Sequence, residues 1–266
     1  MNIFKKEIKQ NLKPFIFWIL GIGFLIFGGM VKFLGVQGTA DNSLQNIIEI
    51  FPKPVLAMLG MAEGNISTFA GFYGILEFYI LIALCCYAIQ LGSNAVLREN
   101  IDKTYEFLYT KPVSRNHILT MKLLAGICFL TLITLLNLLF SYLAPELYGI
   151  ENSLNEKMLL FTLAIYLISM LYFSVTVLLS TLIKKSQMAI QLSYISLLIG
   201  YGLAVMFDLD EKFEIVRCLT PLKYFRVSEL SEGIFSIPYL IVTLVIIIVC
   251  LIFTYHFFKR KDLNAV

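Results

Sequence analysis

Charged residues are scarce in this 266-residue chain, and their scarcity limits what the protein can be. Only 15% of the residues are charged and 59% are hydrophobic, whereas soluble domains carry about 25% charged residues. This composition excludes an ordinary water-soluble fold and makes the lipid bilayer the expected solvent. The formal net charge of +3 is small, and we expect no nucleic-acid partner.

The sequence also lacks the signatures of common catalytic sites. It contains no GxxxxGK[ST] phosphate loop, no HExxH zinc motif and no GxSxG nucleophile elbow. The two histidines, His117 and His256, have no neighbouring ligands in the sequence, and the five cysteines lack the spacing of a metal site or a disulfide framework. We therefore expect no catalytic, cofactor-binding or metal site on this chain.

Long apolar segments are what the sequence does contain. Crossing the hydrocarbon layer takes roughly 20 apolar residues, and such segments form helices because lipid offers no partner for free backbone groups. The sequence predicts an all-α polytopic membrane protein, a single domain over residues 1–266 with no soluble part. Its six transmembrane helices are predicted at about 15–36, 71–96, 118–143, 158–182, 187–207 and 236–258.

Lysine and arginine set the expected orientation of these spans. With the N-terminus inside, the inner segments hold 14 of the 21 basic residues. Because inner loops are enriched in Lys and Arg, both termini are predicted to be cytoplasmic. Phe4, Ile8 and Leu12 recur every fourth residue among lysines, which predicts an N-terminal interfacial helix over 2–13. A basic flank that only sets the topology is the alternative.

Two outer loops show short patterns of their own. In the 37–70 loop, apolar residues from Leu44 to Phe51 have helical spacing, and Pro52 and Pro54 are expected to break that helix. In the 208–235 loop, residues 208–217 are predicted to form a short helix that Pro221 ends or redirects. These loops are expected to cover the outer face of the protein.

Polar residues inside the spans are candidates for a transport pathway. A carboxylate within a spanning helix costs roughly 2.5–3.5 kcal/mol, so Glu77 is expected to face a cavity or a partner. A broken polar stripe connects it with Tyr87 and Asn94 in span two, and span three offers Asn137. Hydrogen bonding between helices is the alternative role for these side chains, and Glu77 has the further alternative of lying near the outer headgroups.

A charged stretch, RENIDKTYEFLYTKPVSRNH at 98–117, interrupts the apolar sequence. Ile101, Tyr105 and Leu108 fall at i, i+4 and i+7, which predicts a short helix over 101–109 with one apolar face. Pro112 is expected to end it, and Ser114 is placed to cap the helix that becomes span three. A helix, a sharp turn and a second helix at the cytoplasmic surface favour docking to another protein.

This stretch resembles the coupling region of ABC exporter permeases of the type-2 (ABC-2) family. Family members show an acidic residue, a pattern like GTLEFLLTLPVSR, and then a lysine that opens span three. The matching residues here are Glu99, KTYEFLYTKPVSR at 103–115, and Lys122. Lys103 replaces the usual glycine and Tyr109 a usual leucine. STLIKKSQMAI at 180–190, SLQNIIEIFPKPVLAMLG at 43–60 and TPLKYF at 220–225 are similar to the same family.

The resemblance implies a half-transporter in a bacterial cell (plasma) membrane. Two six-span permeases, identical or different, would pair and export a substrate, and two separate ABC ATPase subunits would bind below them. The substrate stays open among peptides, drugs, lipids and ions. Glu77 would lie near the pathway, and ATPase coupling would fall to Glu99, Tyr105, Glu106, Phe107, Leu108, Pro112, Ser114 and Arg115.

Two other functions remain open on the residues alone. A proton-coupled secondary transporter would use Glu77, but it predicts inverted repeats and broken helices, and the sequence shows neither. A non-transporting membrane protein, such as an immunity factor or a sensor, is the second. A neighbouring gene that encodes a phosphate-loop ATPase would separate the ABC permease from both.

Overall fold

The computed structural model describes residues 3–38, 51–61, 68–103, 113–151, 153–209 and 214–259. Regular secondary structure in these ranges is entirely helical, and six of the helices are long and apolar enough to cross a membrane. The prediction of an all-α protein with six spans is confirmed. The six are α1 (Ile3–Gly38), α4 (Phe69–Ile101), α6 (Arg115–Leu147), α7 (Met158–Leu182), α8 (Ser186–Leu209) and α11 (Ile237–Phe258).

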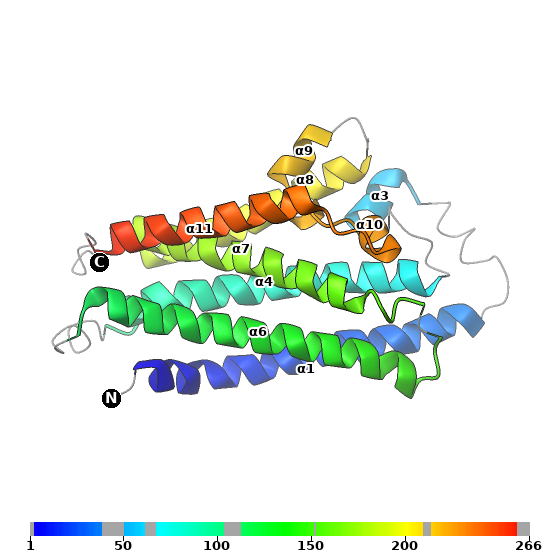
Figure 1. Cartoon of the computed structure of the whole chain (residues 1–266), viewed down its shortest axis with the longest axis horizontal. Helices are drawn as coiled ribbons and strands as arrows, with labels where there is room; N and C mark the ends of the chain where they lie inside the picture. The colour runs from blue at the N-terminus through cyan, green and yellow to red at the C-terminus, as the bar shows by residue number, and fades with distance from the viewer. Residues whose placement is uncertain are drawn as a thin grey trace.

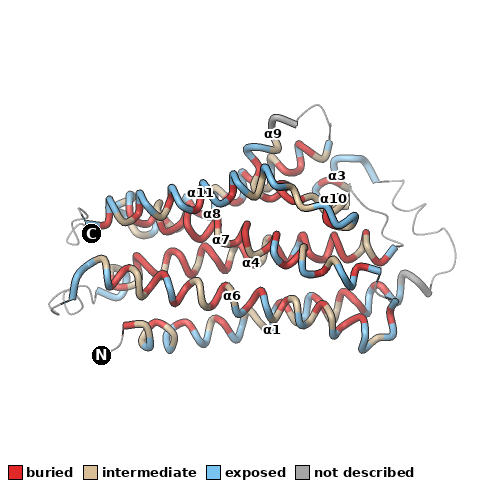
Figure 2. The backbone as a smooth tube through the Cα atoms, viewed as in Figure 1, coloured by how far each residue is buried: buried red, intermediate tan, exposed pale blue. Residues whose placement is uncertain are grey.

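The six helices form an elongated bundle with α4 and α7 at its centre (Figure 1). Helix α4 packs mainly on α7, α1 packs on α6, and α11 packs on α7. Buried residues concentrate along α4 and α7, whereas α1, α8 and α11 each keep a wide exposed face (Figure 2). Those faces are apolar, as lipid-facing surfaces are: Phe17 and Phe24 of α1 are 74% and 79% exposed.

The central helices approach each other closely because small residues lie at their contact. A Cβ atom on Gly92 of α4 would lie 2.9 Å from the carbonyl oxygen of Phe173 on α7. Small residues at such crossings let backbones approach in the absence of a hydrophobic driving force. The α4–α7 pair is therefore a close-packed centre around which the other helices are arranged.

Three helices are longer than the hydrocarbon layer requires. Helix α1 has 36 residues, and α4 and α6 have 33 each, which gives lengths of about 50–54 Å against about 30 Å of hydrocarbon. Turns at their ends therefore lie beyond the hydrocarbon. The predicted segments 2–13 and 15–36 lie in one continuous helix, α1, which runs through Pro14.

Short helices cover the ends of α4, α7 and α8 that lie away from the start of α1 (Figure 1), and we call these helices the outer cap, after the orientation that the sequence predicts. They are α3 (Lys53–Met58), α9 (Glu214–Leu219), the 3-10 helix η2 (Pro221–Lys223) and α10 (Val227–Glu232). Tyr79 of α4 donates a hydrogen bond to the carbonyl oxygen of Leu59 at 2.9 Å, which holds the end of α3. Ion pairs of 2.7 Å join Lys223 to Asp208 and Arg217 to Glu229.

The structure refines the expectations for the outer loops. Pro52 precedes α3 and Pro54 lies in its first turn, which suits proline because the first helical amides need no partner. The predicted helix upstream, from Leu44, lies largely outside the described residues. Of the short helix expected over 208–217, residues 208–209 belong to the end of α8 and residues 214–217 to α9, while residues 210–213 lie outside the described residues.

Candidate functional site

The described residues include seven of the predicted site residues. Five others, Tyr105, Glu106, Phe107, Leu108 and Pro112, lie outside them, as do residues 104–109 of the predicted 101–109 helix. The predicted start of that helix at 101 is wrong, because Ile101 is the last residue of α4 and Lys103 has a left-handed φ of 54°. The structure therefore describes how the segment between α4 and α6 is held at its two ends. The seven described residues are Glu77, Tyr87, Asn94, Glu99, Ser114, Arg115 and Asn137.

Helix α4 ends in a turn at the position where this sequence has lysine and the family pattern that it resembles has glycine. Asp102 caps the helix, and Lys103 follows with φ of 54°. This left-handed conformation commonly ends helices and is usually occupied by glycine, the residue that family members carry at this position. Lys103 adopts this left-handed conformation although steric contact of its Cβ atom makes it unfavourable. The backbone therefore turns here as it would at a glycine.

Helix α6 begins as the sequence predicts. Ser114 has an extended backbone, and its hydroxyl accepts a hydrogen bond from the amide of His117 at 3.3 Å. This confirms Ser114 as the N-cap of α6. Arg115 is the first residue of the helix and is exposed. The chain therefore enters the segment between α4 and α6 through a left-handed turn and leaves it through a capped helix start.

Buried charges connect these two ends to the start of α1. Lys122 of α6 forms an ion pair with Glu99 at the end of α4, and its Nζ lies 3.7 Å from Oε1 of Glu7 on α1. Glu7, Lys122 and Glu99 are 2%, 4% and 5% exposed. One lysine thus lies between two carboxylates that come from different helices.

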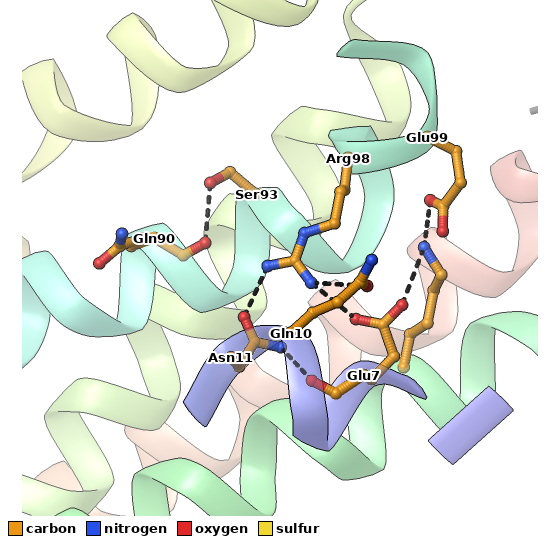
Figure 3. A network of polar contacts seen from close by, with 8 residues as sticks. Glu7, Gln10, Asn11, Gln90, Ser93, Arg98 and Glu99 are labelled. Atoms are coloured by element: carbon orange, nitrogen blue, oxygen red, sulfur yellow. Dashed lines mark hydrogen bonds and ion pairs between the residues drawn. The ribbon is translucent and has the colours of Figure 1, made fainter. Parts of the chain in front are cut away.

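Arg98 completes the network from α4 (Figure 3). Its Nη1 donates to Oε2 of Glu7 and to Oε1 of Gln10, each at 3.2 Å, and its Nη2 donates to Oδ1 of Asn11 at 2.6 Å. The side-chain amide of Asn11 in turn donates a hydrogen bond to the backbone carbonyl oxygen of Glu7 at 3.0 Å. We call Glu7, Asn11, Arg98, Glu99 and Lys122 the inner clamp.

The inner clamp balances its charge with two acids and two bases. Because unpaired charges are costly to bury, the three helices are held in one relative position at this end. Glu7 is the acidic residue of the inner clamp that sequence reasoning missed. The sequence signal is the spacing: Ile3, Glu7 and Asn11 recur every four residues, on the helix face opposite Lys5 and Lys9. In the structure all three are buried.

A second polar cluster surrounds Glu77 near the outer end of the bundle. Glu77 is 3% exposed, and both of its carboxylate oxygens have partners on α6. Asn137 Nδ2 donates to Oε2 at 3.3 Å, and Ser141 Oγ donates to Oε1 at 3.2 Å. The predicted polar residues of spans two and three therefore meet between α4 and α6 within one chain.

The other two pathway candidates lie farther along α4. Tyr87 is fully buried, and its ring lies 5.5 Å from the ring of Trp18 on α1. The Trp18 indole nitrogen donates to Oε1 of Gln90 at 2.9 Å. Asn94 is partly buried. The structure thus brings Glu77 and Asn137 together, and it places Tyr87 beside α1.

A cavity lies next to Glu77 on the α7 side of α4. The segment from η2 to α10, which is part of the outer cap, forms one wall, so the cavity lies between the two central helices and the outer cap. Its walls are mainly apolar, with Glu77, Lys223 and Arg226 as the charged residues that line it. The apolar walls come from Phe78 and Leu81 of α4, Phe161, Ile165 and Ile168 of α7, and Leu222, Phe225 and Leu230 of the cap.

Comparison with protein families gives a match over nearly the whole chain. A family model described as "ABC-2 family transporter protein" matches residues 1–263. A search of curated proteins finds no match. The family match covers nearly the whole chain, including the inner clamp, the Glu77 cluster and the segment between α4 and α6.

Proposed function

The chain belongs to the ABC-2 family of transporter proteins, and from this we propose that it is the permease of a bacterial ABC exporter in the plasma membrane. In this proposal, residues 1–266 form one permease domain. Two such subunits, the second identical or different, form the substrate pathway, and two separate ABC ATPase subunits hydrolyse ATP. The family match over residues 1–263 is the observation that carries the proposal.

The positions of the helix ends support a cytoplasmic site for the ATPase. The start of α1 and the end of α11 lie at the same end of the bundle, together with the end of α4 and the start of α6 (Figure 1). Exposed Lys184 and Lys185, between α7 and α8, add to the basic residues expected on the inner side. We assign this end to the cytoplasm.

We assign ATPase coupling to the segment between α4 and α6. Tyr105, Phe107 and Leu108 would supply apolar contacts to a groove on the ATPase, and Glu106 and Arg115 would supply polar ones. Pro112 and Ser114 would set the sharp entry into α6. Glu99, through Lys122, would carry a displacement of the segment into the inner clamp.

We assign the substrate pathway to the face of α4 that carries Glu77, Tyr87 and Asn94, together with Asn137 of α6. The buried carboxylate between α4 and α6 supports this assignment because intramembrane carboxylates commonly mark transport pathways.

Co-expression with an ABC ATPase tests the proposed function. The gene for an ATPase that neighbours the permease gene would be expressed together with a tagged permease, and the complex would be purified in detergent. We expect co-purification and ATPase activity that a transported substrate stimulates. A permease that purifies without any ATPase, while transport or protection in cells persists, would contradict the proposal.

The single exposed cysteine among the described residues tests the orientation. Cys218 of α9 is exposed, Cys85 and Cys250 are buried, and Cys86 and Cys128 are partly covered. We expect a membrane-impermeant maleimide to label intact cells at Cys218, and Cys218→Ser to abolish that labelling. Labelling that requires opened membranes would place the outer cap in the cytoplasm and reverse the assigned topology.

Replacing Glu77 with glutamine tests its place in the pathway. Glutamine keeps the size of the side chain and a carbonyl acceptor for Asn137 or Ser141, so we expect the variant to fold and assemble normally. Transport or substrate range is expected to change because the buried charge is lost. Ser141→Ala, which removes one neutral donor to the same carboxylate, is the matched control, with a smaller expected effect. Unchanged transport of a wide substrate panel by Glu77→Gln would remove Glu77 from the pathway.

A further inference from the structure

Helix α1 has two chemically different faces at its inner end. Glu7 and Asn11 point into the inner clamp, while Lys5, Lys9 and Lys13 recur at spacings of four and are all exposed. The only acidic residue in α1 is Glu7, and it is 2% exposed. The outer face of these first turns is therefore positively charged without an acid of the same helix beside it.

The same face changes from basic to apolar within one turn. After Lys13, the exposed residues along it are Ile16, Phe17, Leu20 and Phe24. Large exposed apolar side chains mark the lipid hydrocarbon, so the hydrocarbon boundary falls near residues 13–16. From Lys13 back to Lys5 the helix rises about 12 Å, whereas one headgroup layer is roughly 5–8 Å thick. Lys13 and Lys9 therefore lie at the depth of the phospholipid headgroups, and Lys5 lies at their water-facing edge.

We propose that Lys5, Lys9 and Lys13 form a binding surface for anionic phospholipid headgroups of the inner leaflet. Three cations within and at the edge of the headgroup layer complement phosphate-linked negative charge, and each Lys near an anionic surface adds about a fivefold preference, or ~1 kcal/mol. The apolar face that follows accommodates the acyl chains. The assignment to the inner leaflet rests on the proposed function, whereas the headgroup contact itself does not.

The binding surface and the inner clamp share one rigid element. Lys9 and Lys13 lie within one to two helical turns of Glu7 and Asn11, on the opposite side of the same helix. A headgroup held by the lysines would therefore favour the rotation of α1 at which Glu7 meets Arg98 and Lys122. Lipid composition would in this way bias the relative position of α1, α4 and α6.

A tryptophan on the lysine face of α1 provides a direct test without the ATPase. Trp18 is the only tryptophan of the chain but faces α4, where it contacts Gln90, so the test protein combines Trp18→Phe with Phe17→Trp, at a position that is 74% exposed. The purified test protein would be placed in phosphatidylcholine nanodiscs containing a small fixed fraction of brominated lipid, either phosphatidylglycerol or phosphatidylcholine. We expect brominated phosphatidylglycerol to quench its tryptophan as if enriched about fivefold or more, and added salt to reduce the enrichment.

Two variants that remove lysine charges, one on α1 and one away from it, decide whether α1 is responsible. Lys5→Gln/Lys9→Gln/Lys13→Gln is expected to make the two brominated lipids quench equally. Lys184→Gln/Lys185→Gln removes exposed charges away from α1 and is expected to keep the preference. Equal quenching by both lipids in the test protein with its lysines intact, a salt-independent preference, or loss of preference in the Lys184/Lys185 variant would overturn the proposal. Because the test needs no transport, its failure would leave the proposed permease function untouched.

Discussion

Replacing Lys122 with methionine is expected to lower the free energy of unfolding by about 3–5 kcal/mol, the usual cost of removing one partner from a buried ion pair. Methionine is about as long as the aliphatic part of lysine, so the lost stability comes from removing the charge and not from lost packing. Glu99 would be left buried without its cation, whereas Glu7 would keep Arg98. Thermal and denaturant unfolding of the detergent-purified chain, followed by Trp18 fluorescence, would measure the change.

A double variant separates the loss of charge from the loss of packing. Adding Glu99→Gln to Lys122→Met removes the stranded carboxylate, so we expect most of the stability to return. Lys9→Met, on the exposed face of α1, is the control, with an expected change within about 0.5 kcal/mol. Two results would refute the buried clamp. One is a loss of unfolding free energy in Lys122→Met as small as that in Lys9→Met; the other is a loss in the double variant equal to the sum of the losses in Lys122→Met and Glu99→Gln.

The spans and helix starts could be predicted because they depend on local sequence. Apolar segments of sufficient length fix where helices cross the bilayer, and the serine hydroxyl at 114 satisfies the amide three residues later wherever the helix lies. Glu77 and Asn137 were also identified, because a carboxylate and an amide in apolar helices need partners. That they are partners of each other required the packing of α4 against α6.

The inner clamp could not be predicted, because its contacts join distant parts of the chain. Arg98 and Glu7 are 91 positions apart, and only the packing of α1 between its neighbours brings them together. Lysines dominate the N-terminal sequence and indicate contact with the membrane surface. The buried side of the same helix carries its single acidic residue, Glu7. The boundary predicted between the segments 2–13 and 15–36 likewise falls inside one helix, because α1 continues through Pro14.

The largest functional effect is expected from Tyr105→Ala combined with Leu108→Ala. By spacing, both side chains lie on one apolar face of the segment between α4 and α6, and the assigned ATPase groove is where they would be buried. Burying one large side chain contributes about 1.5–3 kcal/mol, so losing two should weaken ATPase binding by on the order of a hundredfold or more. The six spans are unchanged, so the variant should still insert into the membrane.

Coupling should fail together with docking, because the ends of this segment are tied to the helices that it would move. A displacement at its start reaches Glu99 and, through Lys122, the first turns of α6 and α1. We therefore expect the double variant to lose substrate-stimulated ATPase activity and transport, and Glu106→Arg to do the same through charge repulsion. Thr110→Ala, on the opposite side by helical spacing, is the control and should bind the ATPase normally. If the double variant transported at the normal rate with its ATPase fully bound, the segment would be a solvated loop, and coupling would have to run through another part of the cytoplasmic surface.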